Sequence, residues 1–459
     1  MAERSPEVVR FTDGGLGNDA YLIVSGETAV AVDPARDVRR YLEAAESRKA
    51  RIVATFETHL HADFVSGARE LAARGAGVYA SASAGLSFTH RVMREHQRVE
   101  VDGLSLRALA TPGHSPEHLA YIVEGTDPPI LFSGGALIPG GAARTDLLGE
   151  ERKVELARLL YRTLHERLAD LPDATVVHPT HGAGSFCSTG GAGSGDRSTT
   201  LGFERKHNPL LNADSEEAFL DTLLSGYGLY PPYFLRLREF NRAGPPVLLG
   251  PPGPPRLEPS DVERDFASGA WALDIRSADS YASGHLDQSV IVPLGGGSFA
   301  VRLGWVVPWG TRLVLIADDE ASVWKATMKA AGIGYEDIAG WATFESLRDA
   351  GMRVVETPMV DAQELAALLE GVDRPTVLDV RHPSEWREGI LPGAMTVEFG
   401  ALAQRIPPEL RRGPVVTYCA TGARAAVAAS LLERAGIDSF VIFPGGPEEW
   451  RASGRPLAS

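Results

Sequence analysis

The chain has 459 residues, of which 44% are apolar and 23% are charged, and its formal net charge is −15. This length is enough for about three domains of roughly 150 residues each, and the composition is that of an ordinary globular protein. The negative charge would repel a phosphate backbone, so we expect no nucleic-acid partner. Because the sequence has no run of about 18 apolar residues, we also expect no membrane segment.

Only two cysteines are present, Cys187 and Cys419. So few cysteines in so long a chain argue against a disulfide framework and for a reducing compartment. The opening residues, MAERSPEVVRFTD, lack the apolar core of a signal peptide. We therefore expect a cytoplasmic protein in which a lone thiol can act as a reagent. Assembly into a homo-oligomer is left open by the sequence.

The first part of the chain alternates short apolar strands with amphipathic helices. The pattern predicts a strand hairpin at 20–24 and 29–32, a helix at 38–47, a strand at 51–55, a helix at 64–74, strands at 107–111, 119–123 and 130–132, a helix at 154–168 and a strand at 175–177. Polar residues of the kind that bind metals recur where these strands end, and strand ends are where α/β architectures place their sites.

Histidines form the most prominent of these groups. The motif THLHAD gives the pattern H-x-H-x-D with His59, His61 and Asp63, while His114 and His181 follow later strands. Alternate residues of an extended loop point the same way, so His59 and His61 can converge on one ion. Imidazoles suit zinc or iron. Any one histidine could be purely structural, but four at loop positions with an aspartate among them predict a site.

This constellation resembles the metallo-β-lactamase fold, and within it the branch of persulfide dioxygenases and glyoxalase II, over residues 17–209. The resemblance implies an αββα sandwich. Two departures stand out: Phe64 replaces the final histidine of the family's H-x-H-x-D-H motif, and FSGG replaces a strand-end FSGD. The iron ligands of the dioxygenases map here to His59, His114 and Gly135. Glycine has no side chain, so the carboxylate ligand is missing.

What the resemblance leaves is a degenerate metal site. Its expected ligands are His59, His61 and His114, with Asp63 and His181 less favoured. We weigh two outcomes equally, one iron or zinc ion in this domain or no metal, because three neutral ligands bind less firmly than a set with a carboxylate. No organic cofactor is expected.

Two stretches interrupt the chain after these motifs. One is STGGAGSGDRSTT at 188–200, and the other is GPPVLLGPPGPPRLEP at 244–259. Prolines favour an extended, semi-rigid spacer, so we place the main boundary in the second stretch. This gives a metallo-β-lactamase-like domain at 1–243 and a linker at 244–257.

Beyond the linker the sequence repeats itself. Residues 273–286 read LDIRSADSYASGHL and residues 378–391 read LDVRHPSEWREGIL, an offset of 105 residues. A period of about 100 residues is too long for a solenoid and indicates a duplicated domain. Each copy alternates strands with helices, which predicts a parallel sheet flanked by helices. We place the copies at 258–350 and 358–459.

A second reactive site is predicted at VVTYCATGAR, residues 415–424, where a buried strand stops at Cys419 and a loop leads into a helix. Free backbone N–H groups and the helix dipole favour a thiolate there, and Arg424 adds a fixed cation. An inert core cysteine is the alternative, but the C-x4-R spacing at such a turn favours a reactive thiol. The substrate-binding loop would consist of Ala420, Thr421, Gly422, Ala423 and Arg424.

Residues 360–450 resemble a single-domain rhodanese, which implies a persulfide intermediate on Cys419. Asp379 and Arg381 are expected to be scaffold, since the first copy keeps both. That copy reads LVLIADDE where the second has its thiol, with Ala317 near the position of the cysteine. Two carboxylates there would repel an anionic sulfur group, so we expect the first copy to be inactive.

The whole order resembles the multidomain persulfide dioxygenase–sulfurtransferase fusions. We therefore expect sulfane-sulfur transfer between small molecules, with thiosulfate or glutathione-type persulfides as donors and thiols as acceptors. One alternative is an active persulfide dioxygenase or thioester hydrolase that uses three histidines. Another is a persulfide-binding scaffold or sensor without turnover.

Overall fold

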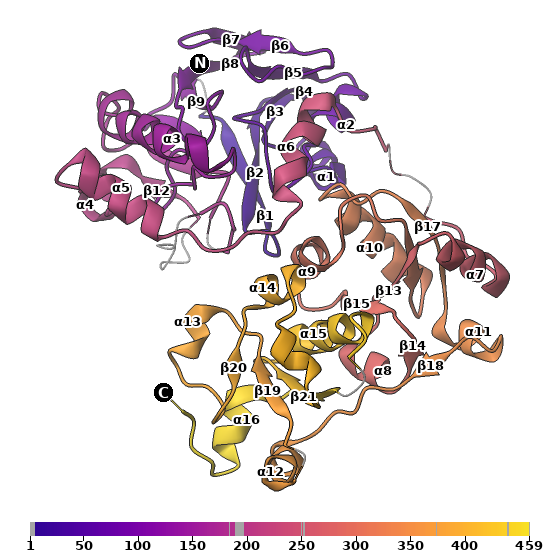
Figure 1. Ribbon diagram of the computed structural model, residues 1–459. Helices are drawn as coiled ribbons and strands as arrows, with labels where there is room; N and C mark the ends of the chain where they lie inside the picture. Colours follow the sequence, from indigo (N-terminus) through magenta and orange to yellow (C-terminus); the bar gives the residue numbers. More distant parts are fainter. Residues whose placement is uncertain are drawn as a thin grey trace. The chain divides into compact units, whose positions relative to one another are not determined.

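The computed structural model describes residues 5–182, 184–188, 197–248, 250, 253–372, 374–437 and 440–458. The chain divides into two compact units, Met1–Pro251 with Ala331–Gly334, and Pro252–Ala330 with Tyr335–Ser459 (Figure 1). Most of the predicted Gly/Ser-rich interruption lies outside the described residues. Among the residues described, no helix has both the length and the apolar character needed to cross a bilayer.

Two six-stranded sheets form the first unit. The first sheet runs in the order β1 (Glu7–Asp13), β2 (Asn18–Ser25), β3 (Thr28–Val32), β4 (Arg51–Phe56), β5 (Gly77–Ser81) and β6 (Arg91–Met93). The second runs β12 (Thr199–Thr200), β11 (Val176–Pro179), β10 (Ile130–Gly134), β9 (Leu119–Glu124), β8 (Leu104–Ala110) and β7 (Arg98–Val101). The predicted hairpin is confirmed, because β2 and β3 pair antiparallel.

The alternation of side chains in β2 explains how the sheets stack. Tyr21 and Ile23 point into a core shared with the second sheet, including Phe132, whereas Leu22 and Val24 point outward. Successive side chains of a strand face opposite sides, so an apolar strand can pack on both faces. Such a sheet must be covered outside as well as inside.

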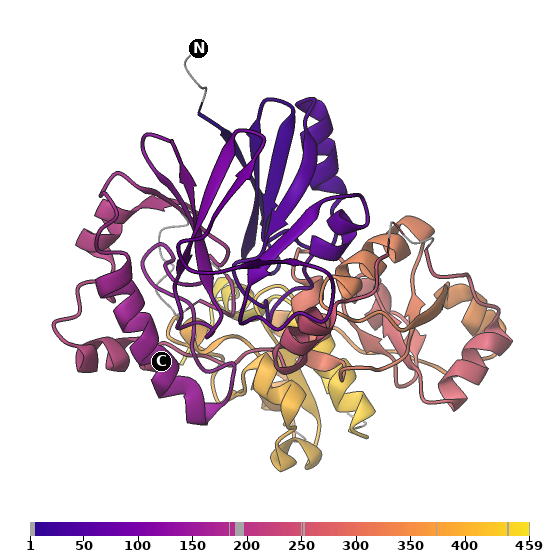
Figure 2. The same cartoon turned by 90° about the horizontal axis from the view of Figure 1, so that it is seen from above.

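Helices provide this outer cover. α1 (Arg39–Ser47) and α2 (Ala68–Ala72) pack on the outer face of the first sheet. The outer face of the second sheet packs on α3 (Glu150–Arg162), α4 (Leu201–His207) and α5 (Glu216–Ser225). The expected αββα sandwich is thereby confirmed, and Figure 2 shows the strands of this unit between helices.

Two predicted helices of this unit end differently from their sequence pattern. The helix predicted at 64–74 is confined to α2, because the buried Phe64 and Val65 belong to the loop that follows β4. The segment predicted as one helix at 154–168 consists of the later part of α3 and a single π-helical turn, Thr163–Arg167, that follows it.

The second unit contains two four-stranded sheets of the same topology. Their orders are β15 (Val290–Ile291), β13 (Trp271–Asp274), β16 (Leu313–Ile316), β17 (Ile338–Ala342), and β20 (Met395–Thr396), β19 (Thr376–Asp379), β21 (Val415–Tyr418), β22 (Phe440–Phe443). Every pairing in these two sheets is parallel. The predicted pair of α/β folds with parallel sheets is confirmed. A short antiparallel pair, β14 (His285–Leu286) with β18 (Val354–Val355), lies beside them.

Helices flank both sheets. The first copy carries α7 (Pro259–Ala267), α8 (Ala278–Ala282), α9 (Phe299–Val306), α10 (Glu320–Ala331) and α11 (Phe344–Asp349). The second carries α12 (Ala362–Glu370), α13 (Pro383–Trp386), α14 (Phe399–Gln404), α15 (Ala423–Arg434) and α16 (Gly446–Ala452).

The repeated D-x-R motif has one structure in both copies. Arg276 donates to the Asp274 carboxylate at 2.6 Å and to the carbonyl of Gly284 at 2.8 Å. In the second copy the same bonds, at 2.7 and 2.8 Å, join Arg381 to Asp379 and Gly389. These buried pairs close the loop after the first strand of each copy, which supports their interpretation as scaffold.

Candidate functional site

Three histidines from distant strand ends converge in the first unit. His59 follows β4, His114 follows β8 and His181 follows β11. All three are buried, and one ligand atom of each lies within 4.8 Å of the others. The Nε2 atoms of His59 and His181 are 3.3 Å apart.

The tautomer of each ring follows from its hydrogen bonds. The Nδ1–H of His114 donates to the carbonyl of Arg144 at 2.7 Å, since a carbonyl can only accept. His59 places Nδ1 2.8 Å from the Thr58 hydroxyl, which itself donates to Asp33 and so accepts from the ring. The Nδ1 of His181 lies 3.2 Å from the amide oxygen of Asn18. All three rings therefore keep an Nε2 lone pair.

This arrangement fits a metal ion. Burial lowers the pKa of His114 to about 3, and burial with the neighbouring histidines lowers the pKa of His59 well below its usual range. Both rings are therefore neutral at pH 7, and neutral lone pairs facing each other at close range need a cation between them. Bonds that fix Nδ1 are the usual outer support of metal-binding histidines. His59, His114 and His181 would hold iron or zinc.

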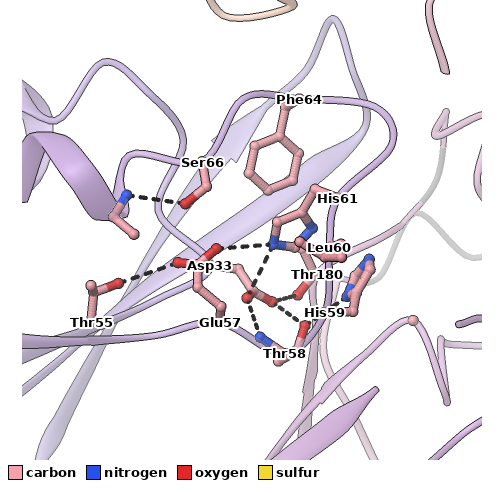
Figure 3. A network of polar contacts seen from close by, with 12 residues as sticks. Asp33, Thr55, Glu57, Thr58, His59, Leu60, His61, Phe64, Ser66 and Thr180 are labelled. Atoms are coloured by element: carbon pink, nitrogen blue, oxygen red, sulfur yellow. Dashed lines mark hydrogen bonds and ion pairs between the residues drawn. The ribbon is translucent and has the colours of Figure 1, made fainter. Parts of the chain in front are cut away.

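His61 is directed toward carboxylates (Figure 3). Its Nε2 lies 3.2 Å from Asp33 and 3.7 Å from Glu57. Burial alone would lower the pKa of His61, but these two carboxylates outweigh burial and raise it. His61 also belongs to two other groups whose ligand atoms lie within 4.8 Å of one another, one with Asp33 and His59 and one with Asp63 and His181. The group that consists of three imidazoles therefore contains His181 rather than His61.

Asp63 lies at the edge of the cluster. Its Oδ2 is 3.3 Å from Nδ1 of His181 and accepts from Asn18 at 2.8 Å. Burial would raise the pKa of Asp63, but His181 outweighs burial and holds it below its usual range. Asp63 is therefore an ionised residue that orients His181.

Gly135 stands where the resemblance to the dioxygenases places a carboxylate ligand, and neighbouring side chains occupy the space around it. The N–H of Gly135 donates to Nε2 of His118 at 3.0 Å. A Cβ at Gly135 would lie 2.7 Å from Cδ2 of His114 and 2.9 Å from Cβ of Ala143. His118 was not among the predicted residues, although it follows His114 by four positions. Its other nitrogen is 2.7 Å from the Thr111 hydroxyl, so both nitrogens are occupied and its role is structural.

The loop that carries His59, His61 and Asp63 is held in place by residues that the sequence patterns did not reveal. Glu117 accepts from the backbone N–H of Leu60 at 3.0 Å and forms two bonds with Arg238, at 2.8 and 2.7 Å. Asn241 donates to the carbonyls of His61 and Phe64 at 2.8 and 2.9 Å. Arg238 and Asn241 lie on α6 (Phe234–Ala243), far along the chain from the motif. No local sequence signal marks them.

A small pocket opens beside this loop. Glu57, His59 and His61 line one part, and Leu60, Ala80, Ala84, Leu86 and Phe88 supply apolar walls. A largely apolar pocket with a few converging polar groups is the usual form of a small-molecule site. His59 and His61 of the histidine cluster therefore border this pocket.

In the second unit, Cys419 directly follows β21, and residues 420–422 connect it to α15. The thiol is fully buried. Gly422, with φ of 79°, begins α15 in a backbone conformation that a glycine adopts without strain. A Cβ at Gly446 would lie 2.1 Å from the carbonyl oxygen of Cys419, so the backbone of the 444–446 turn approaches the loop closely. The predicted strand–loop–helix setting of Cys419 is observed.

Arg424 is the cation expected beside the thiol, and it is already paired. It binds both carboxylate oxygens of Glu385, at 2.7 and 2.9 Å. Burial would lower the pKa of Arg424, but Glu385 and Cys419 outweigh burial and raise it. Arg424 therefore lies next to Cys419, while its charge is largely offset by Glu385.

The equivalent loop of the first copy is organised differently. Ala317 is buried at the end of β16 and offers no thiol. The Asp319 carboxylate accepts from the N–H and the hydroxyl of Ser322, at 2.7 and 2.9 Å. A carboxylate of the chain itself thus occupies the start of α10, where an anionic sulfur group would need free amides.

Cys187 has an inert setting. It is fully buried, and burial together with the nearby Asp63 raises the pKa of its thiol well above the usual range. A thiol that stays protonated is a poor nucleophile.

Comparison with known families agrees with these two sites. Residues 13–181 match the metallo-beta-lactamase superfamily, and residues 361–453 match the rhodanese-like domain. The chain is thus a fusion of a metallo-β-lactamase-fold domain with a C-terminal rhodanese-like domain.

Individual relatives resemble mainly the first part of the chain. Hydroxyacylglutathione hydrolase of Polaromonas sp. (strain JS666 / ATCC BAA-500) is 34% identical over 177 residues, 37% of this chain and 64% of the hydrolase. The chain therefore spans less than two thirds of that relative's length. Human mitochondrial persulfide dioxygenase ETHE1 (Homo sapiens) is 26% identical over 203 residues, 43% of this chain and 72% of that protein.

One solved structure resembles a larger share of the chain. A metallo-beta-lactamase from Staphylococcus aureus subsp. aureus COL has a TM-score of 0.65 and 29% identity, and the match covers 74% of this chain and 99% of that one.

Proposed function

We propose that this chain transfers sulfane sulfur through a persulfide on Cys419, in the metabolism of sulfide and persulfides. The observation that carries the proposal is the place of the thiol, at a strand end, before the N-terminus of the twelve-residue helix α15 and beside Arg424. Helix N-termini stabilise anions, which favours the thiolate and the persulfide alike.

The proposed chemistry takes two balanced steps. The Cys419 thiolate attacks the sulfane sulfur of thiosulfate, an S–S bond to Cys419 forms, the S–S bond of thiosulfate breaks, and sulfite leaves with its electron pair. An acceptor thiolate then attacks the outer sulfur, takes it as a new persulfide and regenerates the Cys419 thiolate. The loop amides of residues 420–423 would hold the anionic sulfur, and the first copy would take no part in bond making because it has no thiol.

Replacing Cys419 tests this function. Cys419→Ser should abolish turnover of thiosulfate with a thiol acceptor, because a hydroxyl is far harder to ionise than a thiol. Mass spectrometry of thiosulfate-treated protein should find one added sulfur on the Cys419 peptide. Cys187→Ser is the matched control and should keep full activity. The proposal is wrong if Cys419→Ser keeps most of its activity. A persulfide that forms on Cys419 without steady-state turnover would instead support a scaffold or sensor.

A second activity is favoured by the three converging imidazoles. His59, His114 and His181 form a set of three imidazole ligands, which is the ligand set of many catalytic zinc sites. A bound zinc or iron ion would supply Lewis acidity and a water of lowered pKa. The likeness to hydroxyacylglutathione hydrolases favours thioester hydrolysis here. Because Gly135 offers only backbone, we expect little persulfide dioxygenase activity.

Metal content and substrate choice separate these activities. Purified protein should contain zinc or iron in proportion to chain, and His181→Ala should lose it. The rate at which the protein hydrolyses a hydroxyacylglutathione should then exceed the rate at which it consumes oxygen with glutathione persulfide. Stoichiometric iron with oxygen consumption that His59→Ala removes would instead establish a working dioxygenase, and metal-free protein would leave this domain without metal chemistry.

A further inference from the structure

The loop that carries His59 depends on other parts of the chain for its shape. Residues 57–67 join β4 to α2 and form no helix or strand, apart from a single bridge between Ser66 and Ala35. All of residues 57–65 are buried. Buried backbone N–H and C=O groups need hydrogen-bond partners, and a loop without regular structure does not supply them itself. The partners of this loop therefore decide where its metal-type side chains lie.

Asn241 of α6 provides three of these bonds with one side chain. Its amide N–H groups donate to the carbonyls of His61 and Phe64, at 2.8 and 2.9 Å. Its amide oxygen accepts from the N–H of Ser66 at 3.0 Å. A side-chain amide offers donors at one end and an acceptor at the other, so both ends of Asn241 are used on this loop.

Two further side chains of the same segment act on the loop. Tyr233, which directly precedes α6, is 1% exposed and donates its hydroxyl to the carbonyl of Asp63 at 2.9 Å. Arg238 of α6 binds Glu117, which in turn accepts from the N–H of Leu60 at 3.0 Å. The backbone of residues 60–66 is thus tied along most of its length to α6 and its neighbours.

The residues just before α6 support the second histidine loop. The carbonyl of Arg144 accepts from Nδ1 of His114 at 2.7 Å. The guanidinium carbon of Arg144 lies 5.1 Å from the centre of the Tyr227 ring and 4.5 Å from that of the Tyr230 ring. The same guanidinium donates to the carbonyl of Gly228 at 2.9 Å. Cation–π contacts at such distances are attractive, so residues 227–230 hold Arg144, and Arg144 holds the His114 ring.

We propose that residues 227–243 form a positioning segment for the proposed metal site, which holds the loops of His59 and His114 at the spacing that one ion needs. One ligand atom of each ring lies within 4.8 Å of the other, although the two loops follow strands of different sheets. This inference rests on the proposed metal site and extends it, because it assigns metal affinity to residues that bind no metal themselves. Tyr233 and Asn241 can be changed without altering a ligand.

The affinity of the full-length protein for Zn²⁺, measured by competition with a chromophoric chelator, tests the proposal. Asn241→Ala removes its three bonds to the loop and should weaken zinc binding about tenfold or more, the usual effect of losing partners that orient metal ligands. Tyr233→Phe removes only the bond to Asp63 and should weaken zinc binding by a smaller factor. Bound Co²⁺ reports the ligand geometry, so its visible absorption bands should shift in Asn241→Ala.

Asn212→Ala is the matched control, because it removes an amide bond to the carbonyl of Asn208, at 2.8 Å, outside both histidine loops. It should leave the zinc affinity and the cobalt spectrum unchanged. A folded Asn241→Ala with wild-type zinc affinity overturns the inference, as does an equal loss in Asn212→Ala. If Asn241→Ala does not fold, as judged by circular dichroism, wild-type affinity in Tyr233→Phe overturns it instead.

A wild type that binds no zinc would refute the proposed metal site, and the positioning role would then be tested without metal. Hydrogen exchange of the peptide that covers residues 57–67, followed by mass spectrometry, should be faster in Asn241→Ala than in the wild type and in Asn212→Ala. Faster exchange supports the positioning role of the segment, and unchanged exchange overturns it.

Discussion

Gly135 shows how a single side chain limits the chemistry of the histidine cluster. A Cβ there would lie 2.7 Å from the His114 ring, and that ring is fixed by its bond to the carbonyl of Arg144. Real Cβ atoms do not approach so closely, so restoring a carboxylate requires His114 or Ala143 to move. The site has thus closed over the position that the dioxygenase branch uses for its acidic ligand.

We therefore predict that Gly135→Asp destabilises the protein rather than rebuilding an iron site. Overpacking of this kind costs about 1–3 kcal/mol, which should lower the midpoint of thermal unfolding by several degrees. Gly135→Ala is the matched control, because it adds the same Cβ without a ligand. Equal destabilisation in both variants confirms the steric explanation. A gain of bound iron in Gly135→Asp alone would contradict it.

Glu117 is a second residue whose effect can be predicted from its surroundings. Burial would raise its pKa, but the bonds from Arg238 outweigh burial and lower it to about 2 from the usual 4.5. A carboxylate with a lowered pKa contributes stability that is complete above the unfolded value and is lost as the pH falls through the folded value. The window of loss is therefore about pH 4.5 to 2, and the contribution is on the order of 3 kcal/mol.

Glu117→Gln should accordingly lower the free energy of unfolding at pH 7 by about 3 kcal/mol, with Arg238 left buried and unpaired. Urea unfolding at pH 7, 4.5 and 3 measures this. The difference from wild type should shrink as the pH falls, because the wild-type carboxyl becomes protonated. Glu239→Gln on the same helix, which removes an exposed pair with Arg242, should have almost no effect. A constant difference at all three pH values would contradict the assignment.

The sequence revealed the residues that lie in short local motifs but not those that act through contacts between distant segments. His59, His114 and Cys419 were predicted because each stands at a strand end inside a short motif. Glu117 and Arg238 were missed because their roles depend on contacts between segments over 100 residues apart. The proximity of His181 to His59 could not be read from the sequence either, since only the folded loops bring the two Nε2 atoms within 3.3 Å.

At the scale of elements, the start of a helix distinguishes the two copies of the repeated α/β fold. α15 follows a loop with a thiol and no acidic side chain, whereas α10 follows a loop whose Asp319 caps the helix. A thiol placed before α10 would meet a carboxylate in place of free amides, and a nearby negative charge raises the pKa of a thiol.

Ala317→Cys should therefore fail to create a second sulfurtransferase site. In a Cys419→Ser background, thiosulfate turnover should stay at the background level, as measured by release of sulfite. Adding Asp319→Ala removes the competing cap and is the variant in which any weak activity should first be detected. Turnover with Ala317→Cys alone would show that the carboxylate does not block the loop.

Element boundaries followed the sequence where one pattern dominated. The hairpin of β2 and β3 was predicted closely, because uninterrupted apolar runs define both strands. The helix expected at 64–74 shrank to α2, because Phe64 stacks on His61, with ring centroids 4.1 Å apart, and the loop serves the site. Tertiary packing overrides local propensity at such positions.

At the scale of the whole molecule, the duplication was visible in the sequence, but the contact between the copies was not. The repeat LD-x-R at an offset of 105 residues predicted two similar folds. The residues that join them show no pattern: the guanidinium of Arg434 lies 3.7 Å from the centre of the Trp271 ring, and the N–H of Ile291 donates to Ser430 at 3.4 Å. Such contacts arise only when both copies have folded.

The same contacts predict the outcome of removing the first copy. α15 is buried along most of its length, from Ala425 to Glu433, and it packs on β15 and α8 of the first copy. Deleting residues 258–347 would expose this apolar face, and newly exposed apolar patches promote association. We expect the shortened chain to lose solubility and, in whatever fraction stays monomeric, to lose reactivity at Cys419, because α15 follows the Cys419 loop and would lose the packing that holds it in place. Size-exclusion chromatography with Cys419 alkylation measures both. Glu433→Gln is the graded control, since it weakens only the contact with His285, and it should cost stability without lowering the alkylation rate. A monomeric deletion variant that transfers sulfur at the wild-type rate would show that the second copy needs nothing from the first.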